Sequence, residues 1–318
     1  MNRMIHNCVC AVVLAAASVT CAAAPFLRIG SGPLNASVEN ERDAAIDRAV
    51  AWLVASQSPE GHWGGSNVVA TAAAALAIRG DREEMPKSDA DAVDKAVKWL
   101  KSSACTNALS TIPPLPQESH LRINGGIPNT PRQRARAWRR LALSVLAPTE
   151  TSVSTNHLGF HCVISFVFER QTIFDEQLSS TLAFALLIRL GERSELEVGG
   201  APDDPALAFI AATFVKTPPP AELKPLVEKL ARTWNEGSPA VWLSNPEAGW
   251  WLARAINGAT GGNLALQPDA DGNVRNVNWR GIMAGKWINS QRIDSFGNGH
   301  WDGDAEKTAF AVLLLNEM

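Results

Sequence analysis

The sequence predicts an all-α fold in which inner helices are covered by outer ones. Apolar residues recur at helical spacing along the whole chain, whereas strand patterns are sparse. Some of the helical segments are apolar on every side, and such a helix must be buried on every side. The chain has 318 residues, of which 46% are hydrophobic and 19% charged, so it is globular and long enough for a large core in one or two domains.

The first two predicted helices differ in character. Residues 43–57 have apolar side chains on one face only, and the segment Ser58–Gly61 ends this helix. Residues 67–79 consist almost entirely of alanine, valine and leucine, and Gly80 ends them. We therefore expect the second helix to be an inner one that other helices shield.

Both helical patterns recur later in the chain. Residues 91–100 repeat the pattern of residues 45–53, and residues 179–190 and 307–315 repeat that of residues 69–79. Each alanine-rich copy has a threonine near its start: Thr71, Thr181 and Thr308. Internal repeats of this kind predict paired helices, each pair burying its apolar face on its neighbours.

Irregular segments lie between the repeats. Residues 103–130 contain four prolines and an Asn-Gly-Gly turn, which predict a long surface loop. Pro131 is expected at the first position of the helix that follows. Further breaks are predicted at residues 192–205 and 216–220, but none is long or polar enough to separate two domains.

A motif of tryptophan, glutamine and glycine occurs twice. In the first copy, Trp52-Leu53 is followed by Gln57 and by Gly61-His62-Trp63. We interpret Trp287–Gln291 and Gly299-His300-Trp301 as a second copy with a longer turn, in which Trp287 corresponds to Trp52. A glutamine at a helix C-terminus can hydrogen-bond the free carbonyl groups there, and the later tryptophan can pack over that end. The motif predicts a clamp between helices, which is a stability device and has no chemistry of its own.

These residues resemble the QW repeats of squalene–hopene cyclases and their relatives. The resemblance is strongest over residues 43–80 and 280–318, and weaker over residues 91–101 and 179–191. The wider superfamily includes terpenoid cyclases, protein prenyltransferase β subunits and the thioester domains of macroglobulins. The resemblance implies an α/α toroid, a barrel of about a dozen inner and outer helices. It implies that residues 25–318 form one such domain.

The N-terminal residues 1–24 are predicted to be a secretory signal peptide. Arg3 supplies a positive charge, residues 8–20 are apolar or small, and Ala22 to Ala24 offer cleavage sites. A membrane anchor would need about 20 apolar residues, and a lipid anchor on Cys21 is the other alternative. We therefore expect a periplasmic or extracellular protein.

Two cysteines, Cys105 and Cys162, lie beyond the predicted signal. An oxidising compartment would permit a disulfide between them, and two buried thiols are the alternative.

The catalytic motifs of the resembling enzymes are missing. There is no Asp-x-Asp-Asp acid motif, as in the cyclases, and no Asp-x-Cys pair beyond residue 24 to continue the zinc site of the prenyltransferases. The nearest acid–base candidates are His300, Asp302 and Asp304, before the last alanine-rich segment. The alternative role for Asp304 is to cap that helix.

Two segments contain residue types that suit a metal site. His157 and His161 would share one face if they were helical, and Cys162 follows them, which suits zinc. Buried, hydrogen-bonded histidines are the alternative. Residues 269–273 alternate oxygen-bearing side chains like a calcium loop, but the twelfth position is Arg280 instead of glutamate, so an ordinary turn is favoured. The sequence does not identify a cofactor.

Two sets of residues are predicted to bind ligands or partners. Six tryptophans could line a cavity for isoprenoids or sugars, with core packing as the alternative: Trp63, Trp250, Trp251, Trp279, Trp287 and Trp301. Four arginines share one helical face and could contact an anionic surface, with a solvated helix face as the alternative: Arg132, Arg136, Arg139 and Arg140.

Charge and motifs limit the function further. The net charge of −3 gives no reason to expect nucleic-acid binding, and GxSxG, HExxH, P-loop and Rossmann motifs are absent. We therefore interpret the chain as a secreted, non-catalytic binding or interaction module that uses a tryptophan-lined cavity. Its partner would be an apolar small molecule or a protein. The alternative is an enzyme acting on an isoprenoid-like substrate, of the terpenoid cyclase or prenyltransferase type.

Overall fold

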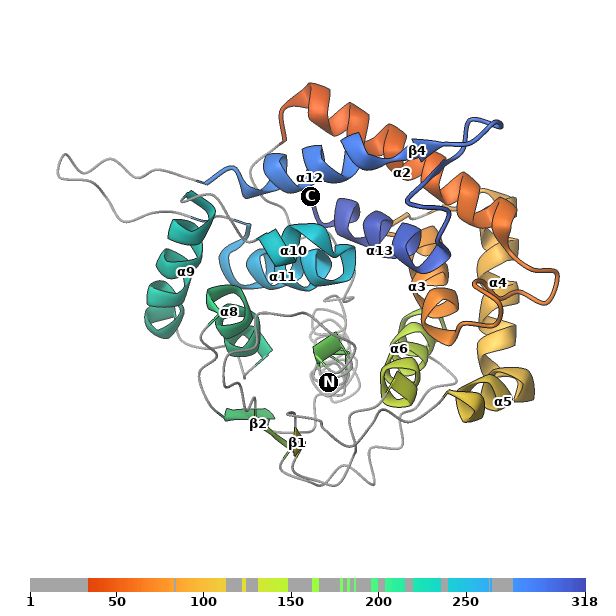
Figure 1. The fold of residues 1–318 in the computed structure, drawn as a ribbon, viewed down its shortest axis with the longest axis horizontal. Helices are drawn as coiled ribbons and strands as arrows, with labels where there is room; N and C mark the ends of the chain where they lie inside the picture. Colours follow the sequence, from red (N-terminus) through yellow and green to blue (C-terminus); the bar gives the residue numbers. More distant parts are fainter. Residues whose placement is uncertain are drawn as a thin grey trace, which may run out of the picture.

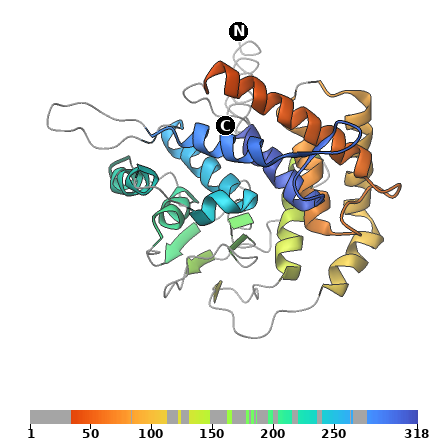
Figure 2. The ribbon, with the colours of Figure 1, turned by 45° about the horizontal axis from the view of Figure 1, so that its top comes forward.

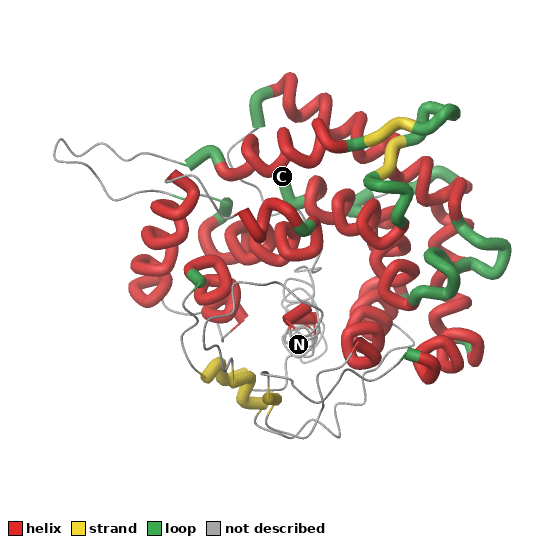
Figure 3. The backbone as a smooth tube through the Cα atoms, in the orientation of Figure 1, coloured by secondary structure: helices red, strands yellow, loops and turns green. Residues whose placement is uncertain are grey.

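Helices form most of the regular structure in the described part of the chain. The computed structural model describes residues 34–82, 84–112, 122–123, 131–147, 162–165, 178–179, 182–183, 186, 196–199, 204–214, 220–235, 240–262, 264 and 277–318. Within these ranges there are eleven helices and a few short strands, which confirms the all-α class (Figure 3). Among the described helices, none combines the length and apolar character that a membrane-spanning helix needs.

The helices are α2 (Ala36–Ser56), α3 (Val68–Arg79), α4 (Lys87–Lys101), α5 (Ser103–Thr111), α6 (Pro131–Leu146), α8 (Pro205–Phe214), α9 (Pro220–Asn235), α10 (Ala240–Ser244), α11 (Pro246–Thr260), α12 (Trp279–Ser290) and α13 (Ala305–Asn316). The strands are β1 (Arg122–Ile123), β2 (Cys162–Ser165), β3 (Leu196–Gly199), β4 (Arg292–Ile293) and β5 (Gly299–His300). Strand β2 pairs antiparallel with β1 and parallel with β3, and β4 and β5 form an antiparallel hairpin.

The helices lie in an inner and an outer row. Helices α6, α3, α13, α11 and α8 contact one another in that order and follow an arc in Figure 1. On the outer side, α4 packs on α3, α2 on α13 and α9 on α8. Helix α12 lies beside α2, as Figures 1 and 2 both show.

The two alanine-rich helices α3 and α13 form the centre of the core. Every residue of α3 from Val68 to Ile78 is buried, as is every residue of α13 from Thr308 to Leu315. The prediction that helices apolar on all sides are covered on all sides is therefore confirmed for these two.

Helix α5 corrects one prediction. The first residues of the segment expected to be a long loop, residues 103–130, are helical as far as Thr111. Ser102 caps this helix by accepting a hydrogen bond from the backbone N–H of Cys105, and Cys105 and Leu109 are buried at helical spacing. The apolar spacing and the cap allow a helix here, because the prolines that predicted a loop begin only after the helix has ended.

The two motif segments make the same hydrogen bonds inside their own units. The backbone N–H of Trp63 donates to Thr71 Oγ1 at 3.1 Å, and that of Trp301 donates to Thr308 Oγ1 at 3.1 Å. The indole N–H of Trp63 donates to Leu53 O at 2.8 Å, and that of Trp301 donates to Trp287 O at 3.0 Å. Trp287 thus takes the place of Leu53, so its alignment with Trp52 was wrong by one residue.

The same segments also join each unit to the next outer helix. Gln57 Nε2 donates to Ala92 O in α4 at 2.9 Å, and Gln291 Nε2 donates to Ala45 O in α2 at 2.8 Å. Ala45 and Ala92 hold matching positions in the segments 45–53 and 92–100. Helix α12 is therefore attached to α2 as α2 is attached to α4.

Ring contacts follow the same pattern. The His62 ring lies 5.3 Å from that of Trp99 in α4, and the His300 ring lies 5.4 Å from that of Trp52 in α2. We call the α12–α2 junction the seam, because it joins the C-terminal part of the chain to α2. At the seam, Arg48 also donates two hydrogen bonds to Gln291 Oε1, at 2.9 and 3.1 Å.

Glycine is required where the clamps are tightest. At Gly61, φ is +97° and a Cβ atom would lie 2.5 Å from the backbone oxygen of Lys95 in α4. At Gly299, a Cβ atom would overlap the carboxamide of Gln291. Either methyl group would therefore disturb the contact between a unit and its neighbouring helix.

Gly299→Ala should lower the free energy of unfolding by about 1–3 kcal/mol, because the methyl group displaces the Gln291 carboxamide from Ala45 O. Thermal and urea unfolding would measure this loss. Gly285→Ala is the matched control in α12, since a Cβ atom there meets nothing within 4 Å. It should leave stability unchanged or raise it by up to about 1 kcal/mol. Equal effects of the two substitutions would contradict the assignment.

Candidate functional site

Charged and polar side chains converge where the inner helices begin. Arg134 lies in the first turn of α6, Glu247 in that of α11 and Glu306 in that of α13. Asn67 caps α3, and Ser179 belongs to a short described helical piece. We call these five residues the N-end cluster.

Arg134 is at the centre of the cluster. Its Nη2 atom lies 2.5 Å from Glu247 Oε2 and 2.6 Å from Glu306 Oε1, and its Nε donates to Ser179 Oγ at 3.1 Å. Asn67 Nδ2 donates to the second oxygen of Glu306 at 3.0 Å. One guanidinium group thus links α6 to α11 and α13, and Glu306 extends the link to Asn67 at the start of α3.

Glu247 is enclosed by donors. Its Oε1 accepts hydrogen bonds from Trp138 Nε1 at 3.1 Å and from the hydroxyl of Ser179. Glu247, Arg134 and Ser179 are all buried, whereas the side chain of Glu306 is 24% exposed. Removing Arg134 or Glu247 would leave a buried charge without an ionic partner, which is strongly destabilising.

Burial and the neighbouring charges have opposite effects on the pKa values in this cluster. Burial raises the pKa of Glu247 above its usual value, the nearby Glu306 adds to this, and Arg134 and Ser179 act against it. Burial disfavours charge on Arg134, but the two carboxylates outweigh it and raise its pKa. The carboxylates at the N-termini of α11 and α13 interact favourably with the dipoles of those helices. The positive charge of Arg134 at the start of α6 interacts unfavourably with the dipole of that helix, and the two carboxylates compensate for this.

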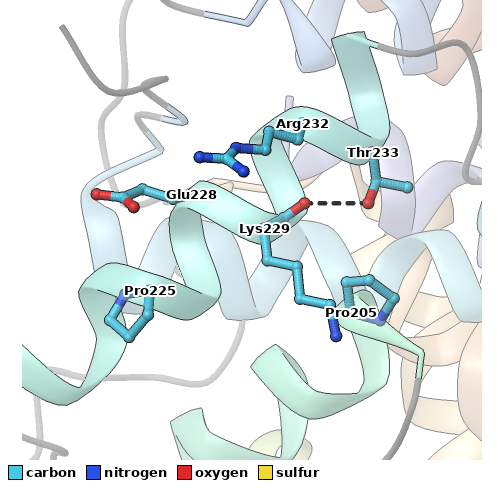
Figure 4. Close-up of a pocket in the computed structure, with 6 residues that line it drawn as sticks. All are labelled: Pro205, Pro225, Glu228, Lys229, Arg232 and Thr233. Atoms are coloured by element: carbon cyan, nitrogen blue, oxygen red, sulfur yellow. Dashed lines mark hydrogen bonds between the residues drawn. The ribbon is translucent and has the colours of Figure 1, made fainter.

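A buried carboxyl group with a raised pKa is a feature of general acids. In this cluster, however, both oxygens of Glu247 face protein donors. A cavity of about 340 Å³ lies on the surface by α8 and α9 and is lined by Pro205, Pro225, Glu228, Lys229, Arg232 and Thr233 (Figure 4). None of the residues predicted to be catalytic or to bind a ligand lines this cavity.

The three predicted acid–base residues lie together in the turn before α13. Asp304 caps the helix by accepting a hydrogen bond from the backbone N–H of Lys307 at 2.8 Å. Asp302 forms ion pairs with Lys307 and, at 3.5 Å, with Arg292; a hydrogen bond and charge from Lys307 hold its pKa below the usual value. His300 Nδ1 accepts a hydrogen bond from the backbone N–H of Gly303 at 2.9 Å. Each of the three has a structural partner.

The six predicted tryptophans are buried in separate packing groups. Trp250 and Trp251 lie 4.5 Å apart and both contact Trp138, which in turn packs edge-on to Phe310. The other four are divided among other groups: Trp287 with Trp301, Trp279 with Trp234, and Trp63 under the end of α2. The tryptophan-lined cavity remains a prediction.

The predicted basic face is divided by the structure. Arg132 donates to Ser110 O and Ile112 O at the end of α5, at 2.9 and 2.8 Å. Arg139 donates to Leu100 O near the end of α4, at 2.6 Å. Arg136 and Arg140 are exposed. Two of the four arginines thus hold helix ends, while two remain available for an anionic surface.

Sequence reasoning missed Arg134, which the basic-face prediction left out. A signal was present, because Arg134 precedes Trp138 by four residues and so lies on the apolar side of the helix. A charged residue on an apolar stripe implies a buried partner. The partners could not be found, since Glu247 and Glu306 are distant in sequence and look like ordinary residues of a first helical turn.

A second buried carboxylate lies at the opposite end of the inner helices. Glu317 accepts hydrogen bonds from Asn257 at 3.0 Å and from Arg254 at 3.2 Å, and burial raises its pKa. Arg280 of α12 donates to Asn257 Oδ1 at 2.5 Å, which adds a third helix. This set fastens α11, α12 and α13 to one another.

A serine–histidine pair near α3 does not form an activated nucleophile. Ser66 has φ of +71°, and its hydroxyl lies 3.3 Å from His62 Nε2. The backbone N–H of Ser66, however, donates to His62 Nδ1 at 3.2 Å. In the neutral ring the proton is therefore on Nε2, so this nitrogen cannot accept the hydroxyl proton of Ser66.

The predicted metal sites fall outside the described side chains. His157, His161 and residues 269–273 lie outside the described residues, and Cys162 is described only as part of strand β2. Within the described part, no group of three or more His, Cys, Asp or Glu residues is placed to hold a metal ion. Cys105 is a free, buried thiol, and its burial raises the pKa of the thiol.

No family model, no curated protein and no solved structure matches the chain.

Arg134→Met should lower the free energy of unfolding at neutral pH by about 3–5 kcal/mol, because it leaves Glu247 buried without its cation. The pKa of Glu247, already raised, should rise further. The folded state then binds a proton more readily than the unfolded state, so the deficit should shrink as the pH falls toward the ordinary carboxyl value. Chemical denaturation at several pH values would measure this.

Arg136→Met is the matched control, since it removes an exposed arginine from the same helix and should change stability by less than about 0.5 kcal/mol. A deficit for Arg134→Met that is small, or independent of pH, would contradict the role assigned to the cluster.

Proposed function

We propose that this chain is a secreted α/α toroid that acts as a non-catalytic interaction module with a protein partner. The observation that carries the proposal is the pairing within the N-end cluster. Arg134, Glu247, Glu306, Ser179 and Asn67 are hydrogen-bonded to one another and hold helices together. In an enzyme of the terpenoid cyclase or prenyltransferase type, catalytic groups would instead face a substrate.

The closed ring is supported by the seam. Gln291 bonds α2 as Gln57 bonds α4, and the His300 ring packs against that of Trp52 as the His62 ring packs against that of Trp99. The C-terminal unit thus meets the N-terminal helices as a neighbouring repeat would. Ser179 bonds side chains of both α6 and α11, which supports placing its short described helical piece in the same inner ring.

Secretion is proposed from residues 1–24 alone, and the periplasmic or extracellular address depends on it. The motif resemblance to squalene–hopene cyclases supports the toroid and is consistent with repeats that close on themselves. A protein partner is favoured over an apolar small molecule because the predicted tryptophans pack against one another and against helix ends. An anionic contact through Arg136 and Arg140 remains compatible with this module.

A second candidate function is an enzyme acting on an isoprenoid-like substrate. One observation favours it: Glu247 is a buried carboxyl group with a raised pKa near the start of the inner helices. His300, Asp302 and Asp304 support it less, because Asp304 is a helix cap and the pKa of Asp302 is lowered. In this alternative, Glu247 would be the proton donor.

Native mass spectrometry with metal analysis, on protein purified from the periplasm, separates the candidates. The interaction module predicts the mass of the polypeptide alone, no stoichiometric metal, and no conversion of added squalene or farnesyl diphosphate. Conversion that disappears in Glu247→Gln, while that variant unfolds at a temperature near that of the parent, would establish the enzyme and overturn the proposal. A stoichiometric metal or a retained apolar molecule would also count against it.

A further inference from the structure

The β4–β5 hairpin is longer than its clamp requires. In the first unit, three residues, 58–60, connect Gln57 to Gly61; in the last unit, seven residues, 292–298, connect Gln291 to Gly299. Both glutamines and both following tryptophans make the same hydrogen bonds. The added residues therefore serve something other than the clamp. In repeat proteins, insertions of this kind map to loops that often form the binding face.

The turn of the hairpin is held in one shape by Asp294. Its Oδ1 accepts hydrogen bonds from the backbone N–H of Phe296 at 2.8 Å and of Asn298 at 2.9 Å. The backbone N–H of Asp294 donates to Asn298 O at 2.9 Å, and Gly297 supplies a φ of +84°. An exposed turn with this many internal bonds is preorganised, so binding through it loses little conformational entropy.

This turn presents an aromatic ring to solvent. Phe296 is 87% exposed and Ile293, in β4, is 52% exposed. Within the described part of the chain, the other exposed large hydrophobic residue is Ile282 in α12, at 46%. Figure 1 shows the hairpin crossing α2, with its turn projecting beyond that helix. An aromatic side chain on a preorganised, projecting turn has the character of a binding hot spot.

We propose that Phe296 is the anchor of a docking surface for a partner protein that offers an apolar pocket with a polar rim. This inference rests on the proposed interaction function and assigns its surface. The charges beside the hairpin are of both signs: Asp294 in the turn, and Arg292 paired with Asp302 at the base. A rim of both signs complements a protein surface, whereas the carboxylates would be repelled by an anionic membrane.

A membrane is also disfavoured by the amount of apolar surface. One phenylalanine and one half-exposed isoleucine are less than the apolar face that membrane-surface binding uses. In a protein interface, by contrast, one buried aromatic anchor can dominate the affinity while the surrounding contacts exclude water. Phe296 therefore fits a protein pocket better than a lipid surface.

The test is a photocrosslinking experiment followed by titration. The full-length precursor is expressed in cells with p-benzoylphenylalanine at position 296, or at position 282 as the matched exposed control. The adduct is identified by mass spectrometry, and that protein is purified and titrated against the parent chain, Phe296→Ala and Ile282→Ala. We expect an adduct from position 296, about a tenfold or greater loss of affinity in Phe296→Ala, and no more than about a twofold change in Ile282→Ala.

Several outcomes would overturn this assignment. They are the absence of any adduct specific to position 296, an affinity unchanged in Phe296→Ala, crosslinking only to a second copy of the chain, and Phe296-dependent flotation with phosphatidylcholine vesicles. Phe296→Ala should unfold at the temperature of the parent because the ring is exposed, so misfolding does not confuse the result. A partner bound without Phe296 would leave the interaction-module proposal standing, whereas substrate conversion would overturn that proposal by itself.

Discussion

The structure depends on one constraint: helices α3 and α13 have no polar face, so each needs protein on every side. Their burial along nearly the whole length explains the two rows of helices. Outer helices α2 and α4 supply one cover, and the neighbours in the inner row supply the other. Such helices can be solvated only at their ends, and it is at the ends that the structure places its caps, clamps and buried charges.

The charged groups at the helix ends specify the arrangement more than they stabilise it. Arg134 fixes the starts of α6, α11 and α13 against one another, and Glu317 fixes the opposite end of α11 and α13. Buried ion pairs of this kind contribute little net stability because desolvation offsets the attraction. They do, however, penalise any packing that separates the partners. This is the behaviour expected of residues that set helix register.

Local features could be predicted from the sequence, and long-range pairings could not. The alanine-rich helices, the recurring threonine and the clamp glutamines were visible because each has its signal within about twenty residues. Thr71 and Thr308 indeed accept the hydrogen bonds of the two motif tryptophans. The helix at residues 103–111 was missed because the prolines after it dominated the interpretation. The Arg134 network was missed because its carboxylates come from helices whose mutual placement only the fold defines.

We infer that the C-terminal unit and α2 meet at the seam as neighbouring repeats do. Hydrogen exchange measured by mass spectrometry on Gln291→Ala tests it most directly, with Gln57→Ala as the matched control. We expect Gln291→Ala to lower protection in α2 and α12 together, and Gln57→Ala to lower it in α2 and α4 while α12 stays protected. Loss of protection confined to α12 in Gln291→Ala, with α2 unchanged, would contradict it.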